Sequence, residues 1–353
     1  MHTTKPGTLL PIARLTLLLV LIAAVSGCSA IGASMKATPT LSHWGGLISM
    51  PVEDLKARYT NEHSRFVQVN GYDIHYQDRG SGETIILMHG IFSSLQTWDP
   101  WANELAKSHR VIALDMPGFG LTGAPADLDR FNEAELFKTF EGFVDQLGVN
   151  QVSLAGNSLG GYMAAYYAAR YPNRVKRLIL LDPFGYPQDT PWILDVGTFA
   201  PVAFLGSYIQ PAWAVTLGVN WVYGDSDRIT AESYSRYVHM NQRPGAKPVY
   251  MKTLEIIEAR ADNPEPPDFD RIAAETLLMW GEEDTWVPLS LADRWREDLP
   301  NAGLVVYPTV GHIPMEELPH DTARDAVIFL SQGLNGACNQ KSGGAVTPRW
   351  SCP

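Results

Sequence analysis

The stretch Gly156-Asn157-Ser158-Leu159-Gly160 decides the fold of this 353-residue chain. The apolar segment 152–155 precedes it and the Ala-rich segment 162–170 follows it, so the sequence predicts a strand that turns at once into a helix. Such a turn forces its apex residue into a strained backbone conformation, and small residues on either side keep the crossing segments apart. Ser158 is the apex, and the pattern predicts a nucleophilic hydroxyl there.

The same turn predicts a site for a developing negative charge. It directs the amide of Leu159 into the space in front of the serine hydroxyl, where the amide can donate to an oxyanion. We assign the second donor to the amide of Ile91, which follows the apolar run 84–88, with Phe92 as the alternative. His89, in the same loop, fits a loop-holding role better than a catalytic one, because a neutral imidazole both donates and accepts hydrogen bonds.

Two further polar residues follow late apolar segments. Asp284 comes after the run 276–280, and His312 comes after the run 303–307. Nucleophile, then acid, then histidine is the order found in the doubly wound hydrolase sheet. We therefore predict that His312 takes the proton of Ser158 and that Asp284 orients the imidazole.

Several charged residues have alternative roles. Asp284 could instead cap the following helix, and Asp182, which ends another apolar run, could supply the acid. Glu316 is expected to cap or pair within the final helix. The spacing of three cap arginines favours solvated charges over a substrate anchor; these are Arg228, Arg236 and Arg243.

Strands and helices alternate on both sides of the serine turn. Two alternating segments, 66–69 and 72–76, are separated by Asn70-Gly71 and predict an antiparallel hairpin. Continuous apolar runs, among them 84–88 and 175–181, predict parallel strands that are covered on both faces. The fold class is therefore α/β, with a doubly wound, mostly parallel sheet.

Residues 184–267 interrupt this alternation and predict a helical cap inserted over the sheet. The segment is rich in aromatic residues, which favours an apolar acyl pocket, although these rings could simply pack the cap against the sheet. They are Trp192, Phe199, Phe204, Tyr208, Trp213, Trp221, Tyr223, Tyr234 and Tyr237.

The first residues resemble an export signal. Lys5 and Arg14 precede the apolar run 15–25, which is short for a membrane-spanning helix. Val25-Ser26-Gly27-Cys28 resembles a bacterial lipobox, so we expect an exported protein anchored to a membrane by a lipid on Cys28; an ordinary cleaved signal peptide is the alternative. Ser29 is compatible with an outer-membrane destination.

Composition and cysteine usage limit the partners. The net charge of −11 and the lack of a basic stripe argue against nucleic acid. Histidine and cysteine lack metal-ligand spacing, so neither a metal nor a cofactor is implied. Cys338 and Cys352 lie in the tail of a chain that we expect to meet oxidising conditions, and we predict a disulfide between them, with two free thiols as the alternative.

Taken together, these motifs resemble the α/β-hydrolase fold superfamily over residues 60–332, in the branch that carries a helical cap. The resemblance implies a serine hydrolase of carboxylic esters, esterase-like or lipase-like, with a small-molecule or lipid-like substrate. It does not imply a particular oligomeric state. The pieces that carry it are His89-Gly90, Asp115-Met116-Pro117-Gly118-Phe119-Gly120, Gly156-Asn157-Ser158-Leu159-Gly160-Gly161, Gly281-Glu282-Glu283-Asp284-Thr285-Trp286-Val287-Pro288 and Gly311-His312.

Ser158 also narrows the activities that this resemblance implies. Epoxide hydrolases and haloalkane dehalogenases of the branch carry Asp at the apex. Meta-cleavage-product hydrolases, which cleave a carbon–carbon bond, share the Gly-Asn-Ser turn and are the first alternative; a non-catalytic binding lipoprotein is the second. The expected divisions are a lipoprotein signal peptide (1–27), a tether (28–60), the hydrolase core (61–183 and 268–332), the cap (184–267) and a tail (333–353).

Overall fold

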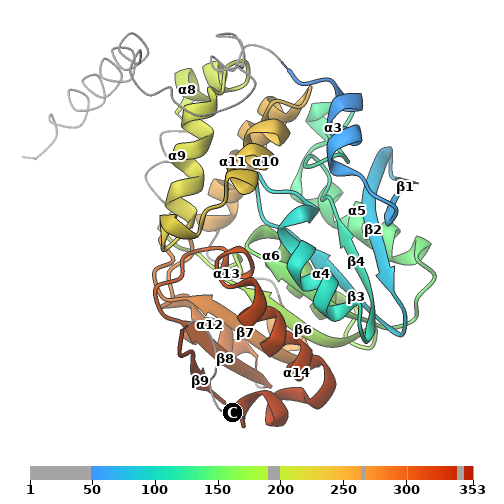
Figure 1. Cartoon of the computed structure of the whole chain (residues 1–353), viewed down its shortest axis with the longest axis vertical. Coiled ribbons are helices and arrows are strands. Elements are labelled where there is room, and N and C mark those ends of the chain that lie inside the picture. The colour runs from blue at the N-terminus through green and yellow to red at the C-terminus, as the bar shows by residue number, and fades with distance from the viewer. Residues whose placement is uncertain (1–48, 190–198, 264–267, 300, 340–345, 353) are drawn as a thin grey trace, which may run out of the picture. The chain divides into compact units, whose positions relative to one another are not determined.

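The computed structural model describes residues 49–189, 199–263, 268–299, 301–339 and 346–352 (Figure 1). Within these ranges one sheet has the strand order β1-β2-β4-β3-β5-β6-β7-β8-β9. Its strands are β1 (Ser64–Val69), β2 (Tyr72–Gly80), β3 (Glu83–Met88), β4 (His109–Leu114), β5 (Val152–Asn157), β6 (Val175–Leu181), β7 (Glu275–Gly281), β8 (Ala302–Tyr307) and β9 (Arg349–Ser351). The central strands, β4 to β8 in this order, are parallel, which confirms the predicted α/β class.

The antiparallel strands lie at the two edges of the sheet. β1 pairs with β2 and β2 with β4 at one edge, and β9 pairs with β8 at the other. Asn70 and Gly71 join β1 to β2 with φ values of 51° and 87°. Both residues tolerate this left-handed region, so the predicted hairpin forms where the Asn-Gly pair placed it.

Helices cover both faces of the sheet. Those of the core are α3 (Val52–Tyr59), α4 (Asp99–Leu105), α5 (Glu133–Gln146), α6 (Leu159–Arg170), α12 (Leu291–Asp298), α13 (Pro314–Glu317) and α14 (Pro319–Cys338), with short 3-10 turns η1 (Leu95–Trp98), η2 (Leu128–Arg130) and η4 (Phe269–Arg271). None of the described helices combines the length and apolar composition that a bilayer crossing requires.

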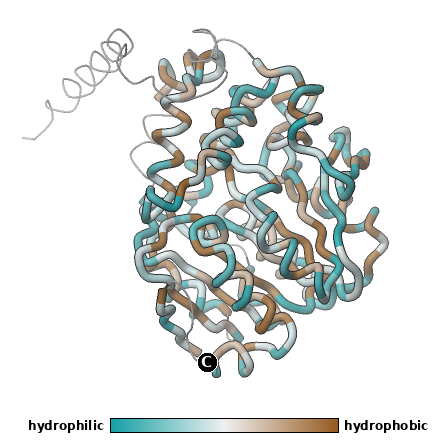
Figure 2. Tube along the Cα trace, viewed as in Figure 1, coloured by the Kyte–Doolittle hydropathy of each residue, from teal (hydrophilic) through white to brown (hydrophobic). Residues whose placement is uncertain are grey.

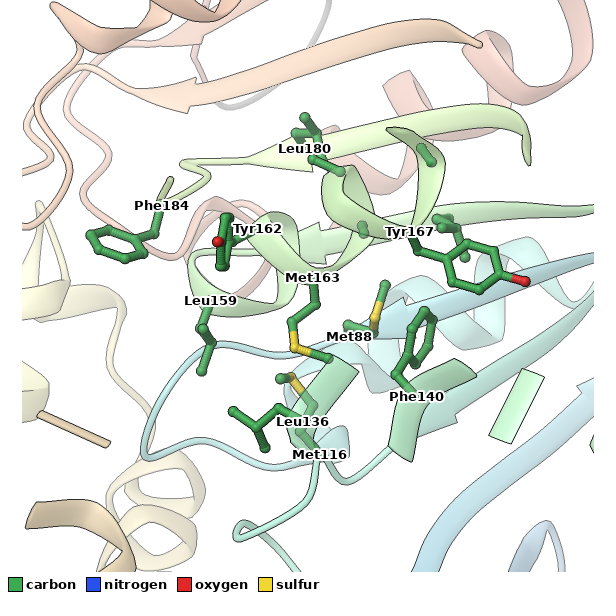
Figure 3. Close-up of a cluster of buried hydrophobic side chains, with 14 of the residues drawn as sticks. Met88, Met116, Leu136, Phe140, Leu159, Tyr162, Met163, Tyr167, Leu180 and Phe184 are labelled. Carbon is green, nitrogen blue, oxygen red and sulfur yellow. The ribbon is translucent and has the colours of Figure 1, made fainter. Parts of the chain in front are cut away.

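Two hydrophobic clusters, one on each face, hold these layers together. Ile86 and Met88 of β3 enter the cluster that includes α5, α6 and α12, whereas Ile85 and Leu87 enter the cluster beneath α4 and α14. Adjacent strand residues thus point in opposite directions, as the pleat requires. Figure 3 shows side chains of α5 and α6 gathered against β3 in the first cluster.

The cap consists of helices in its described part, as predicted. These are α8 (Ala200–Gly206), α9 (Ala212–Val222), η3 (Ser226–Arg228), α10 (Ala231–Asn241) and α11 (Ala246–Ala261). They lie together at one end of the molecule in Figure 1, with α3 beside them and the C-terminus at the opposite end.

The C-terminal segment departs from the expected boundaries. The core was expected to end at residue 332, but the final helix, α14, continues to Cys338, with a break at Gly333 where φ is 68°. The predicted disulfide is present between Cys338 and Cys352. It holds β9 next to the end of α14. The predicted signal peptide and Cys28 lie outside the described residues.

Candidate active site

Ser158 stands at the apex of a strained turn between β5 and α6. Its φ of 54° and ψ of −120° leave the ordinary regions of the backbone map. The flanking glycines make this turn possible, because a Cβ on Gly156 would come within 2.3 Å of the Gly160 carbonyl oxygen. A Cβ on Gly160 would come equally close to the carbonyl oxygen of Met88. The local sequence therefore produces the tight turn between strand and helix that the motif predicts; we call this turn the elbow.

His312 and Asp284 meet beside this turn. The imidazole Nδ1 lies 2.7 Å from Asp284 Oδ2, and both side chains are almost fully buried. The other carboxylate oxygen, Oδ1, accepts hydrogen bonds from the amides of Trp286 and Val287, at 2.7 and 3.0 Å. Asp284 thus fixes its own loop and holds the histidine at the same time.

The rival acid, Asp182, occupies a different position. Its Oδ1 accepts a hydrogen bond from the Gly281 amide at 2.9 Å, and its side chain is completely buried. Burial, and then the negative charge of Asp284, raise the pKa of Asp182 well above its usual range. Asp284, and not Asp182, is therefore the carboxylate that contacts His312.

The loop that carries His312 is held by the elbow and by the cap. Asn157 Nδ2 donates to the His312 carbonyl oxygen at 2.9 Å, and the His312 amide donates to the Val222 carbonyl oxygen at 2.8 Å. Glu317 Oε1 accepts hydrogen bonds from the amides of Gly311 and Gly224, at 2.6 and 2.9 Å. The loop that carries His312 and the end of α9 are thus joined directly by hydrogen bonds.

Glu316 does not serve the final helix, contrary to the expectation from the sequence. Its carboxylate accepts hydrogen bonds from Thr97 of the core and from three residues of the cap: Tyr223, Arg236 and Tyr237. Burial by itself raises the pKa of Glu316, but the charge of Arg236 and these hydrogen bonds bring the pKa below its ordinary value. Glu316 is a buried anion that joins cap to core.

The cap arginines also differ from the expectation of solvated charges. Arg236 and Arg243 are buried, with 5% and 7% of their surface exposed. Arg228 is paired with the buried carboxylate of Glu317 at 3.1 Å. All three are structural groups, and none of them lines the cavity described below.

His89 holds its loop, as its position suggested. Its Nε2 accepts a hydrogen bond from the Met116 amide at 3.1 Å, and its Nδ1 lies 2.6 Å from the Gly90 carbonyl oxygen. Burial lowers the pKa of His89, so the ring stays neutral and can accept at one nitrogen while it donates at the other. A buried pair of His75 and Asp115, which the sequence analysis did not anticipate, steadies the neighbouring loop.

Both predicted oxyanion donors lie near the serine. Leu159 follows Ser158 as the first residue of α6, while Ile91 and Phe92 line the cavity in front of the serine. Within the described residues, no protein group accepts a hydrogen bond from these three amides. Phe92 has a φ of 58°, which marks this loop as strained beside the nucleophile.

A cavity of about 280 Å³ opens onto Ser158 and His312. Its walls are mostly apolar and come from the loop after β3, from the cap helices α8, α9, α10 and α11, and from the loops that carry Asp284 and His312. Among the described residues, no lysine or arginine lines it. The lining residues are Gly90, Ile91, Phe92, Ser93, Asn157, Ser158, Gly206, Gln210, Ala214, Val215, Gly218, Val219, Val222, Tyr237, Asn241, Tyr250, Met251, Leu254, Trp286, His312 and Ile313.

The cap aromatics contribute less to this cavity than their number suggested. Of the eight predicted rings that the structure describes, only Tyr237 lines it, whereas the wall from α9 consists of small aliphatic residues such as Val215 and Val219. Four rings, those of Phe199, Phe204, Tyr208 and Trp213, are exposed, and Trp192 lies outside the described residues. The cavity is apolar, but mainly through aliphatic side chains.

Comparison with known proteins supports the fold over most of the chain. Residues 83–319 match the family described as alpha/beta hydrolase fold. A 2-hydroxy-6-oxo-6-phenylhexa-2,4-dienoate hydrolase of Burkholderia cepacia is 28% identical over 287 residues, which cover 76% of this chain and 97% of the relative.

Two solved structures share this fold over most of the chain. A membrane phospholipase A, described as a bacterial virulence factor, is 26% identical with a TM-score of 0.67 and covers 93% of this chain and 100% of its own. A meta-cleavage product hydrolase from Pseudomonas fluorescens IP01 is 26% identical with a TM-score of 0.66 and covers 76% of this chain and 97% of its own.

Proposed function

Since this chain belongs to the alpha/beta hydrolase fold family, we propose that it hydrolyses carboxylic esters with apolar acyl groups through an acyl-enzyme on Ser158. The observation that carries the proposal is the apolar cavity in front of Ser158, whose lining contains no lysine or arginine in the part of the chain that the structure describes. A neutral acyl chain gains free energy on entering such a cavity, because its apolar surface leaves water.

The residues of the site support the following sequence of steps. Ser158 Oγ attacks the ester carbonyl carbon while its proton passes to His312 Nε2, and Asp284 stabilises the imidazolium through Nδ1. The amides of Leu159 and Ile91 donate to the oxyanion of the tetrahedral intermediate. His312 then returns the proton to the leaving alcohol. Water attacks the acyl-enzyme by the same route and releases the carboxylic acid.

The membrane phospholipase A supports ester chemistry on a lipid-like substrate. It spans 93% of this chain, whereas the carbon–carbon bond hydrolase from Pseudomonas fluorescens spans 76%. A phospholipase A acts on the ester bond of an acyl chain, and an acyl chain is what the aliphatic wall of α9 suits.

Cleavage of a carbon–carbon bond is the second candidate, and the curated relatives favour it over ester hydrolysis. Their names describe dienoates, which carry a carboxylate. Burying a carboxylate without a partner costs several kcal/mol, so a dienoate needs a cation or several donors. The polar lining residues, among them Ser93, Gln210 and Asn241, are the donors that this chain could offer.

A comparison of substrates separates the two candidates. We expect purified full-length protein to hydrolyse nitrophenyl esters, with kcat/KM rising as the acyl chain lengthens, and to cleave 2-hydroxy-6-oxo-6-phenylhexa-2,4-dienoate far more slowly. Ser158→Ala is the control and should lose both activities.

A fluorophosphonate probe should label Ser158 in the folded protein. Efficient cleavage of the dienoate with poor ester turnover would favour the second candidate, and absence of labelling would favour a non-catalytic binding protein.

We also propose that the chain is exported and anchored to a membrane by a lipid on Cys28. The apolar run 15–25 and the following Val25-Ser26-Gly27-Cys28 support this proposal. Mass spectrometry of the mature N-terminus should find residues 1–27 removed and an acylated Cys28. A Cys28→Ser variant should shift from the detergent phase to the aqueous phase on Triton X-114 partition, and an unmodified Cys28 in the wild-type protein would contradict the anchor.

A further inference from the structure

The outer face of α8 and α9 is an exposed apolar surface. Residues 199–223 contain no Asp, Glu, Lys or Arg. Figure 2 shows hydrophobic segments recurring along both helices. The large side chains exposed here form what we call the cap face: Phe199 (48% exposed), Phe204 (67%), Leu205 (58%), Tyr208 (64%), Trp213 (37%) and Leu217 (41%).

The inner face of the same two helices is a wall of the cavity. Gly206 of α8 and Ala214, Val215 and Gly218 of α9 line it. A single layer of helix therefore separates the space in front of Ser158 from the cap face. Whatever covers the cap face lies within one helix diameter, about 10–12 Å, of the cavity.

The described chain also begins at this end of the molecule. The Met50 amide donates to the Gln242 carbonyl oxygen just after α10 at 2.8 Å, and Leu55 of α3 packs with Met240 of α10. Twenty residues, 29–48, separate Cys28 from the first described residue. Extended, they span at most about 70 Å. A lipid on Cys28 would therefore be joined to the molecule at the end that carries the cap helices, and Figure 1 shows this end of the described chain.

We propose that the cap face docks on the surface of a lipid bilayer and turns the cavity toward the acyl chains. Exposed aromatic and aliphatic side chains on an uncharged pair of helices suit the boundary between headgroups and acyl chains, where Trp and Tyr are enriched. The net charge of −11 gives no attraction to anionic lipids, so docking depends on apolar contact and changes little with salt.

A fluorescent label tests the docking without relying on catalysis. Full-length protein with Ser158→Ala, which cannot consume lipid, carries a label on Leu217→Cys and is reconstituted in phosphatidylcholine vesicles that contain nitroxide-labelled lipid. We expect strong quenching of this label. The matched control, a label on Lys107→Cys, lies just before β4, at the amino ends of the parallel strands and so opposite the site; its quenching should be weak.

Three outcomes of this measurement overturn the proposal. The first is equal, weak lipid quenching at positions 217 and 107. The second is a label at position 217 that aqueous iodide quenches freely, because the cap face is then open to water. The third is a label shielded from both quenchers in a protein that sediments as a dimer, because a second copy of the chain then covers the cap face.

Kinetics give a second test, separate from the quenching measurement. This test rests on the proposed function, because it follows ester hydrolysis. The triple variant Phe204→Ser, Leu205→Ser, Leu217→Ser should keep its rate on dissolved nitrophenyl butyrate within about twofold and lose at least about tenfold on a long-chain ester held in vesicles. Phe66→Ser removes an apolar side chain of similar exposure (37%) from β1 and should leave both rates unchanged. Equal rates of the triple variant and the wild type on vesicles would contradict docking.

A wild type that is inactive on both esters would contradict the proposed function. The quenching measurement would then still decide whether the cap face docks on the bilayer.

Discussion

At the scale of single residues, the site depends on how two buried carboxylates divide their roles. Asp284 accepts three hydrogen bonds, two from backbone amides and one from His312. Asp182 accepts one, from Gly281, and faces the charge of its neighbour. The two acids at adjacent strand ends therefore differ in their surroundings, and burial beside Asp284 raises the pKa of Asp182.

This division predicts unequal effects of removing the two charges. Asp284→Asn should lower kcat by about 10³–10⁴-fold, because the amide favours the wrong tautomer of His312 and cannot stabilise the imidazolium. Asp182→Asn, which keeps an acceptor oxygen for the Gly281 amide and leaves the bond between Asp284 and His312 in place, should lower kcat less than about tenfold. Ester turnover of both variants, with circular dichroism to check folding, makes the comparison. An equal loss in both would assign the acid role to Asp182 as well.

The sequence predicted these residues because each belongs to a local pattern. Ser158 lies between glycines that only a tight turn requires, and Asp284 and His312 follow strands in a fixed order. Glu316 could not be assigned in this way, because its partner Arg236 lies 80 positions away on a helix whose orientation only the folded cap determines. The spacing of the cap arginines gave the wrong answer for the same reason, since spacing does not say which face of a helix a partner covers.

At the scale of elements, the junction between α10 and α13 holds the cap on the core. Arg236 and Glu316 form an ion pair in which neither side chain has more than 7% of its surface exposed, and Tyr223, Tyr237 and Thr97 also donate hydrogen bonds to the carboxylate. A buried pair of this kind contributes little net stability but is costly to break on one side.

Arg236→Met should destabilise the protein by about 3–5 kcal/mol, because it leaves the carboxylate of Glu316 buried without a cation. The double variant with Glu316→Leu should recover much of that loss. Arg228→Met is the control, since Arg228 is partly exposed and its partner Glu317 keeps three amide donors; we expect a loss of about 1 kcal/mol or less. Urea unfolding monitored by circular dichroism measures all three. An unchanged midpoint for Arg236→Met would rule out this account of the junction.

The contact between α3 and α10 predicts a dependence of stability on pH. Tyr59 donates to Nδ1 of His239 at 2.7 Å, and burial, followed by the charge of Arg58, lowers the pKa of His239 from 6.5 to about 4. The folded state therefore binds fewer protons than the unfolded state between these two values. Its stability is full above pH 6.5 and falls as the pH drops toward 4.

Thermal unfolding at pH 7 and at pH 4.5 should show a lower midpoint at the acid pH. His239→Gln should reduce this difference, because the amide oxygen can accept from Tyr59 at both pH values. Part of the difference should remain, since burial also lowers the pKa of His89 and His109. The same pH dependence in the variant and the wild type would remove His239 from the explanation.

At the scale of the whole molecule, most strands of the sheet and their directions were predicted from the sequence, whereas the contacts between distant segments were not. Continuous apolar runs marked the parallel strands, and Asn70-Gly71 marked the hairpin. β9 was not predicted: Arg349–Ser351 is too short to show a pattern, and it pairs with β8 only because the chain is brought back beside α14. The extension of α14 beyond Gly333 was missed because glycine normally ends a helix.

The disulfide should stabilise this edge without affecting catalysis. Cys338 and Cys352 are 14 positions apart, and closing a loop of that length contributes up to about 3 kcal/mol. The double variant Cys338→Ser, Cys352→Ser should lower the unfolding midpoint and expose the β9 amides to hydrogen exchange, while kcat on a soluble ester stays the same. Adding reductant to the wild type should reproduce both effects, and protected β9 amides in the variant would show that the strand holds without the bond.

The bonds between the His312 loop and the end of α9 have a consequence for recombination. A graft that exchanged only residues 184–267 with those of a relative would replace Gly224, where a Cβ would come within 2.6 Å of the Gly311 nitrogen, and Arg228, whose side chain pairs with Glu317. Both segments, Val222–Asp225 and Gly311–Glu317, therefore have to be transplanted as one inherited module, although they lie far apart in the chain. New specificities in such a scaffold should arise more readily by point changes along the inner wall of α9 than by wholesale exchange of the cap.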